Sequence, residues 1–115
     1  MAAVHYANQS MAYHIAALID ANNACKDQEN LIDFSNESAL AKIYGSESAW
    51  GAVDEAIQVL GGMGYMKECE LERILRDLRI FRIFEGTNDI LRLMVARNGL
   101  KTLGNKISFV LRVSL

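Results

Sequence analysis

The segment from Ile80 to Asp89 places one carboxylate, Glu85, between an apolar stretch and the start of a helix. Desolvation by Phe81, Ile83 and Phe84 would disfavour the charged form of this acid. A base tuned in this way suits proton abstraction in a site from which water is excluded. Gly86, which follows, would let a substrate approach the backbone closely. Spacing alone also allows the plainer interpretation that Glu85 is a surface acid before a helix N-terminus.

A glycine-rich segment lies between Gln58 and Gly64 (QVLGGMG). Backbone N–H groups of glycine can approach a phosphate without hindrance from side chains. The dinucleotide-binding fingerprint would need a third glycine at position 67, which is Lys67, and the segment follows a predicted helix instead of a strand. A Rossmann site is therefore excluded. A helix C-cap and a nucleotide site of another kind remain as interpretations.

Other residues capable of chemistry form weaker patterns. The arginines from Arg73 to Arg82 recur every three residues among acidic ones, which predicts a solvated or ion-paired face. His5 and His14 would face opposite sides of one helix, so they cannot form a metal pair by themselves. Cys25 and Cys69 fit no zinc or redox spacing. The sequence therefore predicts no metal site.

The elements that must position these residues are predicted to be helical. The chain has 115 residues, 51% of them hydrophobic and 23% charged, which is typical of one globular domain. It contains no proline, which favours long helices with short connections. A net charge of −2 gives no indication of nucleic-acid binding, and no apolar run reaches the ~18 residues of a membrane span. The N-terminal residues show no targeting segment.

Apolar periodicity and capping residues predict an all-α fold with three long helices and one short helix. The predicted helices lie near residues 1–21, 36–61, 70–78 and 88–103. Residues 22–34 are predicted to be a loop, and residues 79–84 are too short a pattern to distinguish strand from loop. The tail after Gly104 is apolar and strand-like. Because a bundle of four helices is the commoner closed form, we expect an incomplete bundle whose apolar stripes need a partner.

Three motifs, in this order and with these gaps, resemble the acyl-CoA dehydrogenase family: Gln58–Tyr65, Glu72–Asp77 and Glu85–Arg92. The likeness extends over most of the chain and is strongest to the very-long-chain branch, through the run RDLRIFRIFEGTNDILRL. It implies that residues 1–104 form a portion of the family's C-terminal helical bundle. Residues 105–115 form a tail that we leave unassigned.

The resemblance implies a flavoprotein that oxidises a long- or very-long-chain acyl-CoA to the trans-2-enoyl-CoA in fatty acid β-oxidation. FAD would accept the hydride, and electron-transfer flavoprotein would take the electrons onward. Glu85 would abstract the α-proton, and Gly86 would contact the substrate. Two segments would contact FAD, the second reaching the cofactor of the neighbouring subunit in a homodimer: Thr87, Asn88 and Asp89, and then Gln58, Val59, Leu60, Gly61 and Gly62.

The family's N-terminal helical domain, middle β-domain and first C-terminal helices have no counterpart in this sequence, so we expect these residues alone to be inactive. The resemblance also implies a mitochondrial location, in the matrix or at the inner membrane, with any membrane association through parts outside this sequence.

Two other classes of function stay open. Exposed apolar stripes favour a non-catalytic assembly module related to the family, and the Gly61–Gly64 turn alone favours a nucleotide-binding regulator. Glu85 favours chemistry, because a scaffold has no use for a base there.

Overall fold

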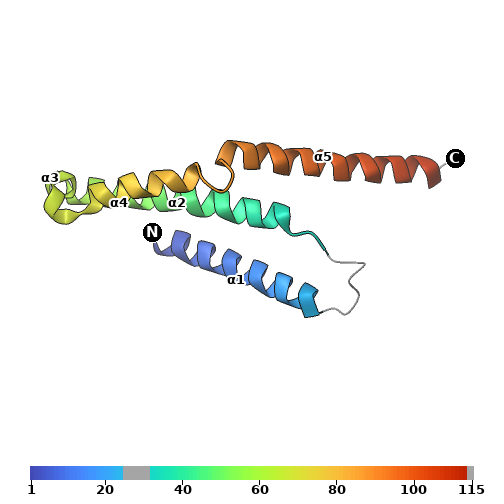
Figure 1. The fold of residues 1–115 in the computed structure, drawn as a ribbon, viewed down its shortest axis with the longest axis horizontal. Helices are drawn as coiled ribbons and strands as arrows, with labels where there is room; N and C mark the ends of the chain where they lie inside the picture. The colour runs from blue at the N-terminus through green and yellow to red at the C-terminus, as the bar shows by residue number, and fades with distance from the viewer. Residues whose placement is uncertain (25–31, 114–115) are drawn as a thin grey trace.

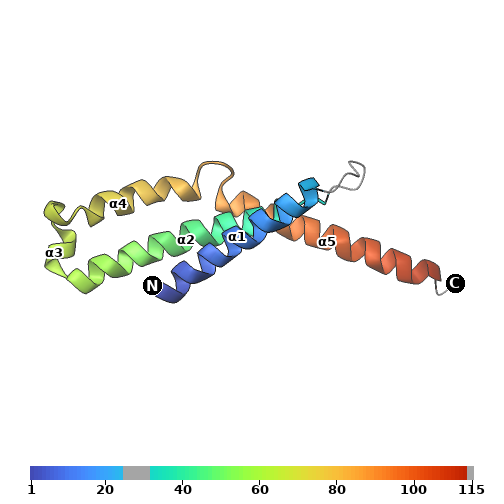
Figure 2. The ribbon, with the colours of Figure 1, turned by 90° about the horizontal axis from the view of Figure 1, so that it is seen from below.

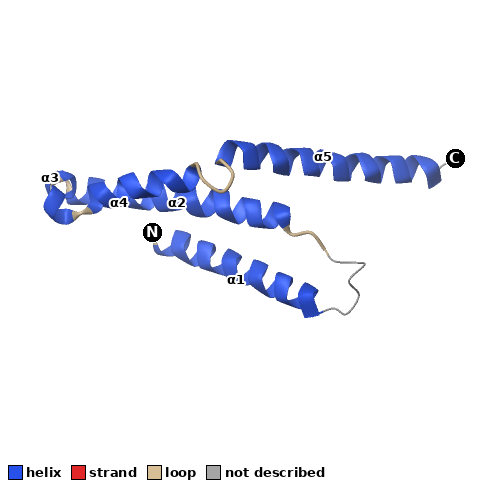
Figure 3. Cartoon of the chain, in the orientation of Figure 1, coloured by secondary structure: helices blue, strands red, loops and turns tan. Residues whose placement is uncertain are grey.

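The structure, a computed structural model, describes residues 1–24 and 32–113. Within these ranges every regular element is helical (Figure 3). The long helices are α1 (Ala2–Ala24), α2 (Ser35–Leu60) and α5 (Asn88–Val113), and the short ones are α3 (Gly62–Tyr65) and α4 (Leu71–Leu78). Two single 3-10 turns, η2 (Lys67–Cys69) and η3 (Arg79–Arg82), flank α4. The predicted all-α class is confirmed.

Helix α2 is the centre of the arrangement, because α1, α4 and α5 all pack against it (Figure 1). The chain turns at α3, and α4 then runs back along the C-terminal half of α2. Asn8 of α1 donates a hydrogen bond to Ser48 of α2 over 2.7 Å. Helix α5 begins beside the middle of α2 and continues beyond its N-terminal end, which makes the molecule elongated, at 68 × 31 × 25 Å (Figure 2).

The apolar core is very small. Among the described residues, Ala39 and Ile43 of α2 are the buried hydrophobic ones. Large apolar side chains stay exposed on all three long helices, for example Tyr13, Leu40 and Leu100, with exposed fractions of 70%, 51% and 70%. This exposure is what an incomplete bundle leaves. Of the described helices, none is both long and apolar enough to cross a membrane.

Two glycines of the QVLGGMG segment have structural roles. Gly61 caps α2 with a φ of 55°, a left-handed value that glycine adopts easily, so the helix C-cap interpretation is confirmed. Gly64 is buried against α2, where an added Cβ would lie 2.5 Å from the carbonyl oxygen of Ile57. A Cβ added at Gly62 would meet nothing within 4 Å. Packing against α2 therefore explains why residue 64 is a glycine. No such contact explains why residue 62 is a glycine.

The strand-like prediction for the tail after Gly104 was wrong, because α5 continues through it to Val113. Helix α5 contains two glycines, Gly99 and Gly104, and each costs only about 1 kcal/mol relative to alanine, which does not end a helix that contains no proline. Helix α1 likewise continues past Asn22, whose side chain exchanges two hydrogen bonds of 3.1 Å with the backbone of Ile32. Residues 32–34 of the predicted loop lie outside any helix, as predicted, and residues 25–31 lie outside the described residues.

Candidate active site

The turn that carries Glu85 joins η3 to α5 and has an unusual backbone. Glu85 has a φ of 52° and Gly86 a φ of 85°, so two consecutive residues are left-handed. A left-handed residue other than glycine costs roughly 1–2 kcal/mol. Strained backbone of this kind is concentrated at active sites and ligand clamps. Its occurrence at the predicted base is the first structural indication of a site.

Glu85 lies at the edge of an apolar groove of about 550 Å³ between α2 and the segment that follows α4. On α2 the groove is lined by small residues spaced four apart, Ala41, Gly45 and Ala49. Residues one turn apart lie on the same face of a helix, so this spacing leaves room along α2. Opposite them are Leu78, Phe81 and Phe84, and the two phenylalanine rings meet edge to face with centroids 5.2 Å apart. The volume is in the range of small-molecule sites.

The dry surroundings expected for Glu85 are not formed by these residues. Glu85 is exposed, and Phe81, Ile83 and Phe84 are 46%, 47% and 43% exposed. The expectation that these three side chains desolvate the carboxylate was therefore wrong for the chain on its own. The physical reason is that no described element covers this side of the groove, whose apolar lining faces solvent.

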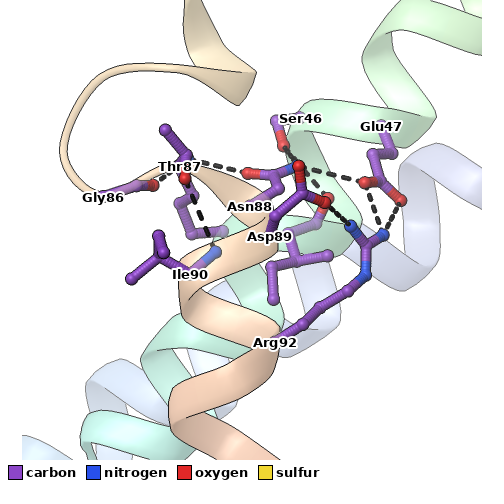
Figure 4. Close-up of polar contacts among 10 residues, drawn as sticks. Ser46, Glu47, Gly86, Thr87, Asn88, Asp89, Ile90 and Arg92 are labelled. Atoms are coloured by element: carbon purple, nitrogen blue, oxygen red, sulfur yellow. Dashed lines mark hydrogen bonds and ion pairs between the residues drawn. The ribbon is translucent and has the colours of Figure 1, made fainter.

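Asn88, at the first position of α5, fastens the Glu85 turn to α2. Its side chain is 2% exposed and donates hydrogen bonds to Oγ of Ser46 (2.9 Å) and Oε1 of Glu47 (3.1 Å) (Figure 4). Its Oδ1 accepts a hydrogen bond from Nζ of Lys42 over 2.7 Å. The same ammonium group donates to the carbonyl oxygen of Gly86 over 2.8 Å. Lys42 therefore binds the turn at Gly86, the residue after Glu85.

Glu47 and Arg92 form a second tie between α2 and α5. Arg92 Nη2 lies 2.5 and 2.7 Å from the two carboxylate oxygens of Glu47, and Nη1 lies 3.4 Å from Asp89 (Figure 4). The hydrogen bonds from Arg92 lower the pKa of Glu47, against partial desolvation, which raises it. The hydrogen bond from Asn88 and the charges of Arg92 and Arg82 lower the pKa further. Glu47 is thus held as a carboxylate.

This lowered pKa predicts a loss of stability in acid. A carboxyl group whose pKa is lower in the folded than in the unfolded chain stabilises the fold above its unfolded pKa, roughly 4.3. That contribution disappears as the pH falls through the folded pKa. We expect the free energy of unfolding of Glu47→Gln to fall less between pH 6 and pH 3 than that of the wild type. Urea unfolding followed by circular dichroism measures this, with the exposed Glu55→Gln on the same helix as control; equal pH dependence in both variants would contradict it.

The structure places the two predicted FAD segments far apart. Thr87, Asn88 and Asp89 lie beside Ser46, in the middle of α2, whereas Gln58–Gly62 spans the exposed C-terminal end of that helix. At 1.5 Å per residue, Ser46 and Gly61 are about 20 Å apart along the axis. Thr87 Oγ1 accepts a long hydrogen bond of 3.5 Å from the N–H of Ile90. The structure therefore groups Glu85–Asp89 with Lys42, Ser46 and Glu47, and not with Gln58–Gly62.

The sequence analysis did not predict that Lys42, Ser46 and Glu47 lie at the candidate site. The spacing of Lys42 and Ser46, one turn apart beside the small residues of α2, is the signal that marks this face. Elsewhere, Arg73 pairs with Glu70 over 3.3 Å, with both side chains over 60% exposed, which confirms an ion-paired face at that position. In the described part of the chain, no cluster of His, Cys, Asp or Glu could hold a metal ion.

Comparison with known proteins shows to which protein family this chain belongs. The sequence profile of the family described as "Acyl-CoA dehydrogenase, C-terminal domain" matches residues 1–100. The chain therefore belongs to the acyl-CoA dehydrogenase family, within its C-terminal domain. The likeness found from the three motifs is confirmed.

Individual relatives show which branch of the family this chain resembles most in sequence identity among those compared. The chain is 53% identical over 108 residues to the mitochondrial very long-chain specific acyl-CoA dehydrogenase of Bos taurus, and 52% identical to that of Homo sapiens. These matches cover 94% of this chain but only 15% of each relative. The mitochondrial short-chain specific enzyme of Bos taurus is 48% identical over 75 residues, which cover 65% of this chain and 18% of that relative.

Proposed function

We propose that this chain supplies the catalytic base of an acyl-CoA dehydrogenase that converts a long- or very-long-chain acyl-CoA to the trans-2-enoyl-CoA in fatty acid β-oxidation. The observation that carries the proposal is the conformation of Glu85, left-handed and at the edge of an apolar groove, on a turn fastened to α2. Family membership supports the reaction, and the names of the relatives support the substrate class and a mitochondrial location. Placement in the matrix or at the inner membrane is part of the proposal.

In this proposal the carboxylate of Glu85 removes a proton from the carbon next to the thioester carbonyl. Such a C–H bond is weakly acidic, so the base must be held at the reacting carbon and charge must be stabilised on the carbonyl oxygen. The ties from Lys42 and Asn88 restrict the turn and hence the direction of the Glu85 side chain. Gly86, where an added Cβ would lie 3.2 Å from the Leu91 side chain, contacts the thioester through its backbone in this proposal. FAD, when bound, supplies the acceptor for the hydride that leaves the β-carbon.

The residues proposed to contact FAD fit that role. Helix α5 has 26 residues, and the N–H groups at the start of such a helix suit a phosphate or a polar cofactor edge. Thr87 and Asp89 lie beside these groups, while the Asn88 side chain is engaged internally and would contribute through its backbone and by positioning. Gln58–Gly62 is exposed, with open space at Gly62, which fits contact with another molecule. We assign this segment to the FAD of a neighbouring subunit in a homodimer, with electron-transfer flavoprotein as the electron acceptor.

A non-catalytic assembly module is the second candidate, and the exposed apolar face of α5 favours it. The nucleotide-binding regulator loses its basis, because capping and packing already explain Gly61 and Gly64. The strained backbone at Glu85 favours the catalytic candidate because it coincides with the apolar groove, whereas Glu70, which is also left-handed, precedes α4 without lining that groove.

A chimera tests the proposed function, because the chain spans only 15% of the length of its very-long-chain relatives. The chain would replace the matching segment of the Bos taurus enzyme, and FAD content and oxidation of a long-chain acyl-CoA would be measured. We expect the chimera to bind FAD and to turn over, whereas the isolated 115 residues should be inactive. A folded, FAD-loaded chimera without turnover would overturn the catalytic proposal in favour of the assembly module.

A further inference from the structure

The backbone of the Glu85 turn is anchored at both ends by hydrogen bonds. At the start, Phe84 donates its N–H to the carbonyl oxygen of Ile80 over 3.0 Å. At the end, the carbonyl oxygen of Thr87 accepts the N–H of Leu91, in the first turn of α5, over 2.9 Å. Between these anchors, the dihedral angles of the intervening residues decide the direction of the Glu85 side chain.

Local preference works against the observed conformation of this turn. Glu85 has a φ of 52°, and a left-handed residue other than glycine is disfavoured roughly five- to thirtyfold relative to its right-handed form. Gly86 has a φ of 85°, and glycine adopts positive and negative φ about equally readily, so Gly86 does not hold the turn by itself. The conformation therefore depends on a contact from outside the turn.

Lys42 of α2 makes this contact. Its ammonium group donates hydrogen bonds to the carbonyl oxygen of Gly86 over 2.8 Å and to Oδ1 of Asn88 over 2.7 Å, at the start of α5 (Figure 4). In the described part of the chain, no other element donates a hydrogen bond to the backbone of Glu85 or Gly86. A hydrogen bond from a charged donor favours the bonded form by roughly 10- to 150-fold, which is enough to outweigh the local preference.

Lys42 acts on the backbone of the turn and not on the carboxylate. It lines the same groove as Glu85, yet within residues 1–24 and 32–113 no ion pair joins the two side chains. Asn88 keeps its hydrogen bonds to Ser46 and Glu47 without Lys42, so loss of the ammonium group leaves α5 fastened to α2. Both partners of Lys42 belong to this chain, so its contacts do not depend on what covers the exposed faces of the helices.

We propose that Lys42 is a positioning residue for abstraction of the α-proton, because its hydrogen bond to Gly86 keeps Glu85 left-handed and directs the carboxylate to the substrate. This inference deepens the proposed function and rests on the role of Glu85 as base. Without the ammonium group, the turn would exchange between left-handed and right-handed forms, of which one places the carboxylate at the reacting carbon. Proton transfer tolerates little misplacement of the base, so the rate would fall.

Lys42→Met in the chimera tests the effect on proton transfer, because methionine keeps much of the apolar stem and removes the ammonium group. Single-turnover bleaching of the flavin at saturating acyl-CoA should slow on the order of tenfold or more, following the local preference against a left-handed Glu85. The FAD content, and the acyl-CoA concentration that gives half the maximal rate, should change little. Lys42→Arg keeps a charged donor and should recover most of the rate. Lys67→Met, at an exposed lysine of η2, is the matched control and should bleach at the wild-type rate.

Nuclear magnetic resonance of the 115-residue chain gives a readout that does not depend on catalysis. The one-bond coupling between Cα of Glu85 and its hydrogen distinguishes a positive from a negative φ. It should indicate a positive φ in the wild type and a shift towards negative φ in Lys42→Met, with the same helix content by circular dichroism. A negative φ in the wild type, or a positive φ that persists unchanged in Lys42→Met, would overturn the inference.

Glu85→Gln in the same chimera separates failure of this inference from failure of the proposed function. If Glu85→Gln loses turnover while Lys42→Met bleaches at the wild-type rate, the role of Lys42 is wrong and the assignment of the base stands. If Glu85→Gln itself bleaches at nearly the wild-type rate, the proposed function fails, and the role of Lys42 in proton abstraction fails with it.

Discussion

Replacing Glu85 with glutamine in the chimera should abolish nearly all turnover and leave FAD bound. The amide keeps the size and polarity of the side chain but cannot accept the α-proton. Loss of general-base catalysis alone slows a reaction on the order of 10²–10⁴-fold. The FAD contacts proposed for Thr87, Asp89 and Gln58–Gly62 do not use this carboxylate, so the cofactor content should not change.

Bleaching of the flavin in a single turnover, with saturating acyl-CoA, measures the effect of Glu85→Gln. Glu85→Asp should give an intermediate loss, because its carboxylate retreats by one methylene and such sites tolerate little misplacement. Glu68→Gln, which changes an exposed acid on the η2 turn, is the matched control and should bleach at the wild-type rate. Bleaching of the glutamine variant at nearly the wild-type rate would remove Glu85 from the role of base.

Replacing the buried Asn88 with leucine should be the most destabilising substitution at the joint between α2 and α5. The Asn88 side chain exchanges hydrogen bonds with Lys42, Ser46 and Glu47, two of which are charged. Each lost hydrogen bond costs about 1 kcal/mol, and the buried Ser46 adds a penalty for losing its partner, so we expect a loss of roughly 2–4 kcal/mol. Lys42 and Glu47 are partly exposed and keep the Gly86 carbonyl and Arg92 as partners. Urea unfolding of the 115-residue chain, followed by circular dichroism, measures it.

Asn98→Leu is the control for this substitution, because it removes a single hydrogen bond, to Asn36, from the same helix. A single intramolecular hydrogen bond contributes about 1 kcal/mol, so this variant should lose much less stability than Asn88→Leu. Equal losses in the two variants would show that Asn88 does not organise the joint.

Most of the helical framework could be predicted from the sequence because it depends on local patterns. The apolar stripes, Asn88 as a start signal and Gly61 as a stop signal each act within a few residues. The end of α5 could not be predicted in this way. The sequence predicts an end near Gly104, yet the cost of each glycine is small, and α5 continues through Gly99 and Gly104 to Val113.

The candidate site was only partly predictable. The motif around Glu85 identified the acid, but a left-handed backbone at a residue other than glycine has no sequence signal. The contact between Lys42 and Asn88 joins residues 46 apart, and it exists only because α5 packs across the middle of α2. The exposure of Glu85 also depends on what covers the groove, and no pattern within 115 residues specifies that.

The most direct test of Glu85 as the base is exchange of the α-proton itself. The FAD-loaded chimera would be incubated in heavy water with an acyl-CoA analogue that carries sulfur in place of the β-carbon. This analogue has no β-hydride to lose, so only the first proton transfer can occur. Mass spectrometry should show deuterium entering the α-position with wild-type Glu85, and a rate lower on the order of 10²-fold or more with Glu85→Gln. Exchange at the same rate in both proteins would contradict the assignment.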